Sequence, residues 1–180
     1  LIGRNGAGKT TLLSVLTAQS PLTSGSVTLD GQTVWENKKA LSHLCFAREI
    51  SQMAGSGIAA VKAKDYLKIA KTFCPHWDQE MADRLTGQFH LDVKKRIGKL
   101  SKGMVSMLTI IVGLASKADI TFLDEPTSGL DVIAREKFYQ LLMEEYTETN
   151  RTFVISTHII EEARFLHEIL FMTPSKTAFR

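Results

Sequence analysis

The chain has 180 residues, of which 44% are hydrophobic and 23% are charged, and its formal net charge is +3. This size and composition fit one globular domain, with or without a subdomain. The charge is small and scattered along the sequence, which argues against a nucleic-acid-binding protein. No apolar run approaches the roughly 18 residues that a membrane-spanning helix needs. Cys45 and Cys74 lack the spacing of a metal site and are predicted to be reduced thiols.

The first predicted element is a phosphate-binding loop. Gly3 to Thr10 read G-R-N-G-A-G-K-T, a complete G-x-x-x-x-G-K-[ST] pattern that follows a strand end and opens a helix. Glycines at these positions let backbone N–H groups surround a polyphosphate. Lys9 is predicted to reach the β- and γ-phosphates, and the Thr10 hydroxyl to bind Mg²⁺. The residues predicted to contact the phosphates at this loop are Asn5, Gly6, Ala7, Gly8, Lys9, Thr10 and Thr11.

Only Leu1 and Ile2 precede this loop, and the chain does not begin with Met. A parallel sheet needs a full strand before such a loop, usually with neighbours on both sides. We therefore expect the sequence to be a fragment that lacks its N-terminal strands.

The remaining predicted elements alternate between strands and helices. In chain order they are a strand at 27–31 that enters a hairpin, a strand at 44–47, helices at 65–73, 78–89 and 101–116, a strand at 120–123, a helix at 132–146, a strand at 152–156, a helix at 161–167 and a strand at 169–172. Asp78 and Ser101 are predicted to cap their helices. Because strands flank a mainly helical middle, we expect an α/β core at 1–53 and 118–180 that is interrupted by a helical subdomain at 54–117.

Two carboxylates follow the predicted strand at 120–123. In open α/β sheets the carboxyl ends of the strands face the ligand, so Asp124 and Glu125 are expected near the phosphate loop. Asp124 is suited to hold Mg²⁺ through water. Glu125 can polarise the water that attacks a γ-phosphate. The pair therefore predicts nucleotide hydrolysis.

Three further segments resemble motifs of the ATP-binding cassette (ABC) family. Leu123 to Asp131 look like the joined Walker B motif and D-loop, Leu100 to Met104 like the signature motif usually written LSGGQ, and Ser156 to His158 like the switch-histidine loop. Their order and spacing match that family over essentially the whole chain. The resemblance implies a P-loop NTPase (RecA-like) α/β core with a mostly parallel sheet and an inserted helical subdomain.

The resemblance also implies contacts between two subunits. In the family the helix that starts at Ser101 presses on the γ-phosphate held by a partner, so Ser101 and Gly103 are predicted to contact ATP there. Lys102 and Met104 replace the usual first Gly and the Gln of the motif. Because the Ser and the second Gly are retained, we expect the contact to be retained. Asp131 is expected to line the dimer seam near the partner's phosphate loop.

The predicted catalytic residues are Glu125, His158 and Lys9. His158 follows a predicted strand and is expected to hydrogen-bond the γ-phosphate and to help hold the attacking water. The predicted Mg²⁺ ligands are Thr10, Asp124 and Gln52. Gln52 is favoured only slightly over Glu49 as the Q-loop residue, because Glu49 lies closer to the end of the strand at 44–47.

The resemblance implies an ATP-binding and ATP-hydrolysing subunit of an ABC transporter that uses ATP and Mg²⁺. Its expected partners are a second nucleotide-binding domain and a polytopic membrane permease, and no nucleic acid. Its expected location is the cytoplasmic face of the membrane, and its signature indicates export. The predicted surface for the permease runs from Ser51 to Trp77, with Phe73 and Trp77 as candidate contacts, although packing is favoured for Trp77. The alternative function is that of a soluble ABC-type ATPase in DNA repair or translation. Neither the cargo nor the choice between homodimer and heterodimer can be read from the sequence.

Overall fold

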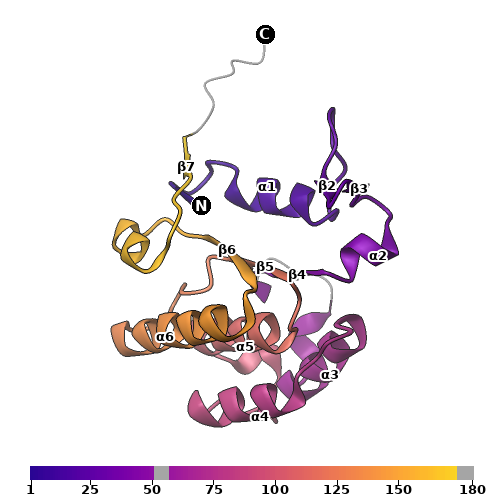
Figure 1. Cartoon of the computed structure of the whole chain (residues 1–180). Coiled ribbons are helices and arrows are strands. Elements are labelled where there is room, and N and C mark those ends of the chain that lie inside the picture. Colours follow the sequence, from indigo (N-terminus) through magenta and orange to yellow (C-terminus); the bar gives the residue numbers. More distant parts are fainter. Residues whose placement is uncertain (51–56, 174–180) are drawn as a thin grey trace.

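The structure is a computed structural model, and it describes residues 1–50 and 57–173 (Figure 1). The strands are β1 (Ile2–Gly3), β2 (Thr28–Leu29), β3 (Gln32–Thr33), β4 (Leu44–Ala47), β5 (Ile120–Asp124), β6 (Thr152–Ser156) and β7 (Phe171–Met172). The α-helices are α1 (Lys9–Leu16), α2 (Lys38–Leu41), α3 (Ala63–Phe73), α4 (Gln79–Gln88), α5 (Lys102–Ala115) and α6 (Val132–Thr149). Short 3₁₀ segments are η2 (Ile58–Ala60), η3 (Ile97–Lys99) and η4 (Ile160–Phe165). None of the helices in these ranges is long and apolar enough to cross a bilayer.

The predicted parallel sheet is confirmed. Strands β4, β5 and β6 pair in parallel, and β1 pairs in parallel with β7. A bridge between Ile2 and Thr157 joins β1 to the end of β6, so the spatial order is β4-β5-β6-β1-β7. Because the strands run the same way, the phosphate loop after β1 and the acids after β5 lie at one edge.

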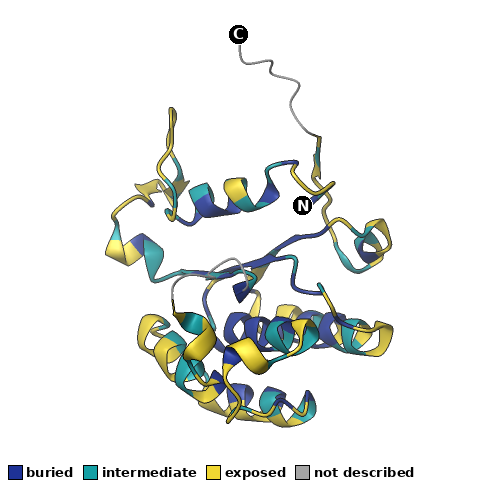
Figure 2. Ribbon diagram, turned by 180° about the vertical axis from the view of Figure 1, so that it is seen from behind, coloured by how far each residue is buried: buried dark blue, intermediate teal, exposed yellow. Residues whose placement is uncertain are grey.

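Helices cover both faces of the sheet, with α1 on one side and α5 and α6 on the other (Figure 1). Side chains of β5 alternate between the two layers, as a buried strand requires. Phe122 packs with Leu13 of α1, whereas Leu123 belongs to the cluster formed with α5 and α6. Gly113 of α5 lets that helix approach closely, because a Cβ there would lie 2.8 Å from Leu123 Cδ2. The buried residues accordingly gather between the layers (Figure 2).

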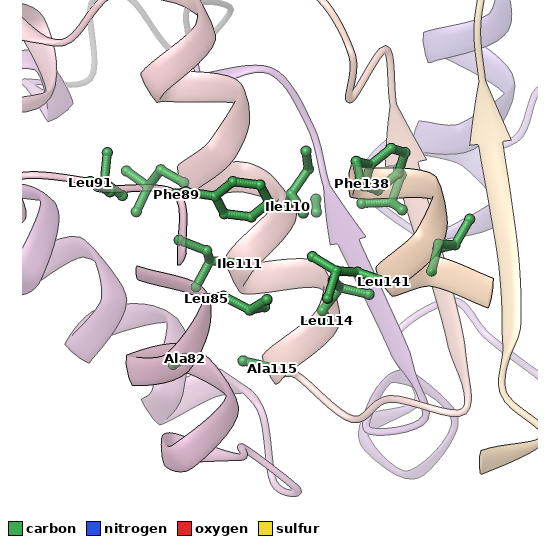
Figure 3. Packing of buried hydrophobic residues seen from close by; sticks show 14 of the residues in the cluster. Ala82, Leu85, Phe89, Leu91, Ile110, Ile111, Leu114, Ala115, Phe138 and Leu141 are labelled. Atoms are coloured by element: carbon green, nitrogen blue, oxygen red, sulfur yellow. The ribbon is translucent and has the colours of Figure 1, made fainter. Parts of the chain in front are cut away.

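The helical segment between β4 and β5 shares its core with the sheet. Leu85 of α4, with Ile111 and Leu114 of α5, packs in one cluster with Phe138 and Leu141 of α6 (Figure 3). The capping predictions are confirmed: Asp78 Oδ1 accepts from Met81 N at 2.8 Å, and Ser101 Oγ accepts from Met104 N at 3.2 Å. Each cap satisfies a backbone donor that the helix start leaves without an intrahelical partner.

Some predicted boundaries differ from the structure. The hairpin at 27–31 is confirmed, but its paired residues are only Thr28–Leu29 and Gln32–Thr33. The segment predicted as a helix at 161–167 forms the 3₁₀ turns of Ile160–Phe165. The predicted strand at 169–172 pairs only at Phe171–Met172, because β1 offers only two residues for pairing.

Candidate nucleotide-binding site

The phosphate loop contains two glycines in left-handed backbone conformations, and the side chain of its lysine folds back onto a carbonyl of the loop. Gly6 has φ +81° and Gly8 has φ +93°, conformations that glycine adopts without steric cost. Lys9 is buried, and its Nζ donates to the Gly3 carbonyl at 2.7 Å. The same Nζ lies 3.0 Å from Glu125 Oε1. The loop therefore holds a cation next to a carboxylate, at the start of α1.

Oxygen atoms suited to Mg²⁺ lie beside this loop. Thr10 Oγ1 donates to Asp124 Oδ2 at 2.7 Å, and Ser156 Oγ donates to Asp124 Oδ1 at 2.5 Å. Asp124 is almost wholly buried. No group of three His, Cys, Asp or Glu side chains within 1–50 and 57–173 could hold a metal ion unaided. A hydroxyl and a carboxylate beside a phosphate loop fit the hard, oxygen-seeking Mg²⁺ that shares its ligands with substrate phosphates.

Glu125 adopts an uncommon backbone conformation for a residue with a side chain. Its φ is +49°, in the left-handed region, and its N–H donates to Ser156 O at 3.2 Å and Ser156 Oγ at 3.0 Å. Its Oε2 lies 2.6 Å from His158 Nδ1. Conformations of this kind cost free energy and cluster at functional sites. The carboxylate is thus fixed between Lys9 and His158.

These groups surround one cavity of about 710 Å³. Its lining includes Asn5, Gly6, Gly8, Lys9, Thr10, Thr11, Glu49, Lys102, Glu125, Thr127, Ser128, Gly129, Arg135, His158 and Ile159. Ala7 does not line it, because its side chain is buried and its N–H donates to Arg4 O at 3.1 Å. Gln52, the slightly favoured Q-loop residue, lies outside the described residues, whereas its alternative Glu49 faces the cavity.

Ser101, Gly103 and Asp131 do not line this cavity. Ser101 is exposed at the start of α5, and Asp131 is exposed while its carboxylate accepts from Ala134 N at 2.8 Å. Gly103 packs against its own chain, since a Cβ there would lie only 2.6 Å from the Gly129 carbonyl oxygen. The sequence had suggested that this glycine lets an anion approach, and the structure adds a contact within the chain.

One charged pair at the edge of the cavity was not predicted from the sequence. Arg135 on α6 lines the cavity, and its Nε lies 3.5 Å from Oε1 of Glu162, which is almost wholly buried in η4. Burial, and then the nearby charge of Glu162, raise the pKa of Tyr139, whose ring stacks on Phe165 at 4.4 Å. The Arg135–Glu162 ion pair and the Tyr139–Phe165 stack connect the segment after His158 to α6. No motif spacing points to the ion pair, because residues 135 and 162 belong to different elements.

A parallel α/β sheet with a glycine-rich loop, a Thr–Asp oxygen pair and a Glu–His pair at one edge defines a P-loop nucleotide-binding domain. Comparison with known protein families narrows this class. Residues 1–128 match the ABC transporter family, and the chain belongs to that family. The family resemblance of the motifs is therefore confirmed.

Two curated relatives illustrate the similarity. The ABC transporter ATP-binding protein YtrB of Bacillus subtilis is 26% identical over 90% of this chain and 54% of its own length. The bacitracin transport ATP-binding protein BcrA of Bacillus licheniformis is 33% identical over 89% of this chain and 52% of its own. The chain thus spans about half the length of these relatives.

The fold is also that of solved cassettes. The dimeric structure of the cassette MJ0796 in a post-hydrolysis state, bound to ADP and Pi, superposes with a TM-score of 0.79 at 23% identity. The match covers 96% of this chain and 79% of that one. This likeness establishes the α/β cassette fold.

Proposed function

We propose that this chain is the ATP-binding and ATP-hydrolysing subunit of an ABC transporter that drives export through an associated polytopic membrane protein. The observation that carries the proposal is the meeting of Lys9, Glu125 and His158 around one cavity. A cation for the phosphates and a carboxylate for water are the two groups that phosphoryl transfer to water requires.

The contacts suggest how binding would prepare the site. Lys9 Nζ now lies 3.0 Å from Glu125 Oε1, so a triphosphate in the loop would compete for the ammonium. The carboxylate would then be released to accept a proton from water, while His158, 2.6 Å from its other oxygen, keeps it oriented. Mg²⁺ held by Thr10 and Asp124 would neutralise charge that develops on the phosphoryl group.

The second half of the site is assigned to another cassette. Ser101 is exposed and does not line the cavity of its own chain, although Lys102 next to it does. Val132 and Ile133, next to Asp131, are 66% and 80% exposed, which leaves apolar surface beside the predicted seam. MJ0796, which shares the fold, forms a dimer. We propose that ATP is bound between the phosphate loop of one copy and Ser101–Gly103 of the other, and that hydrolysis lets the copies separate.

We divide the chain into an ATP-binding core at 1–53 and 118–180 and a helical subdomain at 54–117. The permease contact is proposed to lie on the helical subdomain. Phe73 is 80% exposed at the end of α3 and remains a candidate contact. Trp77 packs against the cluster around Cys45 and Val112, and its Nε1 donates to Gln79 Oε1 at 3.2 Å. Packing is therefore its better-supported role. Under this proposal the protein works at the cytoplasmic face of a membrane and has no nucleic-acid partner.

The transporter function is favoured over a soluble repair or translation ATPase. YtrB and BcrA carry transport in their names, and the interval from Lys9 to Ser101 holds only short helices in its described residues. Such an interval has no room for the long coiled-coil insertion expected of a repair ATPase.

Replacing Glu125 with Gln tests the assigned reaction. The amide keeps the shape of the side chain but cannot accept a proton, so we expect ATP turnover to fall by a factor of about 10² to 10⁴. ATP binding should persist, and an ATP-dependent dimer should accumulate in size-exclusion chromatography. The matched control is Glu144→Gln, because Glu144 is exposed on α6 away from the cavity. Normal turnover in Glu125→Gln would refute the assigned base.

A further inference from the structure

The excess positive charge of the chain is gathered in one part of the fold. Residues 57–100 contain nine Lys and Arg against five Asp and Glu, whereas the rest of the chain has thirteen against fourteen. The expectation that the charge is scattered is therefore corrected. The surplus lies on α3 and on the segment before η3, which are far apart in sequence but adjacent in space.

Backbone hydrogen bonds hold these two segments together. Ala63 N donates to Lys95 O at 2.9 Å, and Lys64 N donates to Val93 O at 2.9 Å. A β-bridge also joins Lys62 to Arg96. The start of α3 and the segment 93–96 therefore form one continuous surface with fixed geometry.

Six exposed cations define what we call the cationic face: Lys64, Lys68, Lys71, Lys94, Lys95 and Arg96. The three on α3 follow at i, i+4 and i+7, so they form one stripe along the helix. None of the six forms an ion pair with a carboxylate in the described part of the chain. Of the nearest acids, Asp65 is half-buried, and the Asp92 carboxylate accepts from Lys94 N at 3.1 Å. The face thus keeps a net positive charge.

Two exposed apolar side chains of α3 lie on the side of the helix away from this stripe, because positions 69 and 73 fall roughly 100–200° around the helix axis from the three lysines. Ile69 is 50% exposed and Phe73 is 80% exposed, one turn apart on α3. The helical layer lies at the outside of the molecule, and exposed residues mark its outer side (Figure 2). The stripe and the segment 93–96 are therefore a cationic surface without an apolar component, and clusters of about four to eight Lys and Arg are typical of surfaces that meet the headgroups of an anionic bilayer.

We propose that the cationic face binds the anionic phospholipid surface of the membrane, an inference that rests on the proposed function at a membrane. Five of the six cations are lysines, which act as point charges on flexible stems. A diffuse layer of headgroups suits such side chains, whereas recognition of individual phosphates in a nucleic acid or phosphopeptide favours the planar guanidinium of arginine.

Vesicle flotation with the full-length protein, without nucleotide or membrane partner, tests this proposal. We expect binding to vesicles of equal parts phosphatidylglycerol and phosphatidylcholine, and none to phosphatidylcholine alone. Binding should weaken when salt is raised from about 0.05 M to about 0.5 M, because exposed charges are then screened. Equal binding to neutral vesicles, or no binding to the anionic ones, would overturn the proposal.

A pair of matched variants assigns the binding to this face. Lys64→Gln with Lys68→Gln should lower the partition coefficient roughly 25-fold, because each lysine near an anionic surface contributes roughly fivefold. Lys38→Gln with Lys39→Gln removes the same charge from the exposed face of α2 and should change binding less than about twofold. Equal losses in both variants would overturn the assignment. So would a wild-type protein that binds poly-glutamate but ignores anionic vesicles, since that result assigns the face to an acidic protein partner.

ATP hydrolysis by wild-type protein in the same preparation separates the two proposals. Hydrolysis without vesicle binding would refute only the lipid surface. Vesicle binding without hydrolysis would refute only the proposed activity.

Discussion

Replacing Gly103 with alanine separates two explanations for this glycine. If it only lets a partner's nucleotide approach, the substitution will not lower the stability of an isolated chain, and it will add the usual helix-propensity gain of about 0.5–1 kcal/mol. The structure predicts the opposite sign. A Cβ at Gly103 would lie 2.6 Å from the Gly129 carbonyl oxygen, which is backbone and cannot rotate away. Gly129 is itself held at φ +79°, and the Ser106 hydroxyl donates to the carbonyl of Ser128 beside it.

The expected change in the free energy of unfolding combines the cost of overpacking with the gain in helix propensity. Overpacking of this kind costs about 1–3 kcal/mol, so we expect Gly103→Ala to lower the free energy of unfolding by about 1–2 kcal/mol after the propensity gain. Gly87→Ala is the matched control, because Gly87 is also helical and has nothing within 4 Å of its Cβ position. That control should raise the free energy of unfolding by about 0.5–1 kcal/mol.

Urea unfolding followed by circular dichroism measures both variants against the parent. Dilute protein without nucleotide is used, so that contacts with a second copy do not contribute. Equal stability of Gly103→Ala and Gly87→Ala would refute the intrachain contact. In that case the remaining explanation for Gly103 would be its approach to a nucleotide held by another subunit.

Three further substitutions or reactions test other parts of the structure. Lys9→Ala should weaken ATP binding at least about tenfold in a titration, since it removes the phosphate-binding cation, and unchanged affinity would defeat the loop assignment. Arg151→Leu should lower the free energy of unfolding by about 3–5 kcal/mol. It removes the guanidinium that lies 2.9 Å from the buried Glu145 and that donates to the carbonyls of Leu114 and Ala118, although Lys117 still pairs with Glu145 at 2.5 Å; a loss below about 1 kcal/mol in urea unfolding would contradict this reading. A hydrogen bond from Cys45 lowers the pKa of Cys74, whereas that contact and burial raise the pKa of Cys45. Cys74 should therefore be alkylated at a lower pH than a free thiol while Cys45 stays unmodified in the folded protein, as mass spectrometry would report; equal labelling would contradict the pairing.

The functional edge of the sheet could be predicted because its residues follow strand ends. The phosphate loop follows β1, Asp124 ends β5, and His158 follows β6, and parallel strands bring such ends together. Sequence spacing therefore encodes the geometry. Helix starts were also readable, since Asp78 and Ser101 cap through their own side chains.

Contacts between side chains of distant elements were not predictable in this way. The pairing of Arg135 with Glu162 joins α6 to η4, and no helical or strand period relates the two positions. Cys45 and Cys74 meet although their sequence spacing suggests no contact. Such contacts depend on how α3 and α6 pack against the sheet, which local propensity does not determine.

The contact of Gly103 with Gly129 bears on the proposed mechanism as well as on stability. Glu125, the proposed catalytic base, is followed within a few residues by Ser128 and Gly129, which contact Ser106 and Gly103 in the first turns of α5. A displacement of Glu125 on loss of the γ-phosphate would therefore move the start of α5 as well, because packed elements shift as units rather than deform. Under the proposed dimer, that helix start touches the partner's nucleotide. Hydrolysis in one copy would then weaken the contact between its α5 and the ATP bound by the other copy. The contact of Gly103 with Gly129 inside each chain would thus couple the two sites.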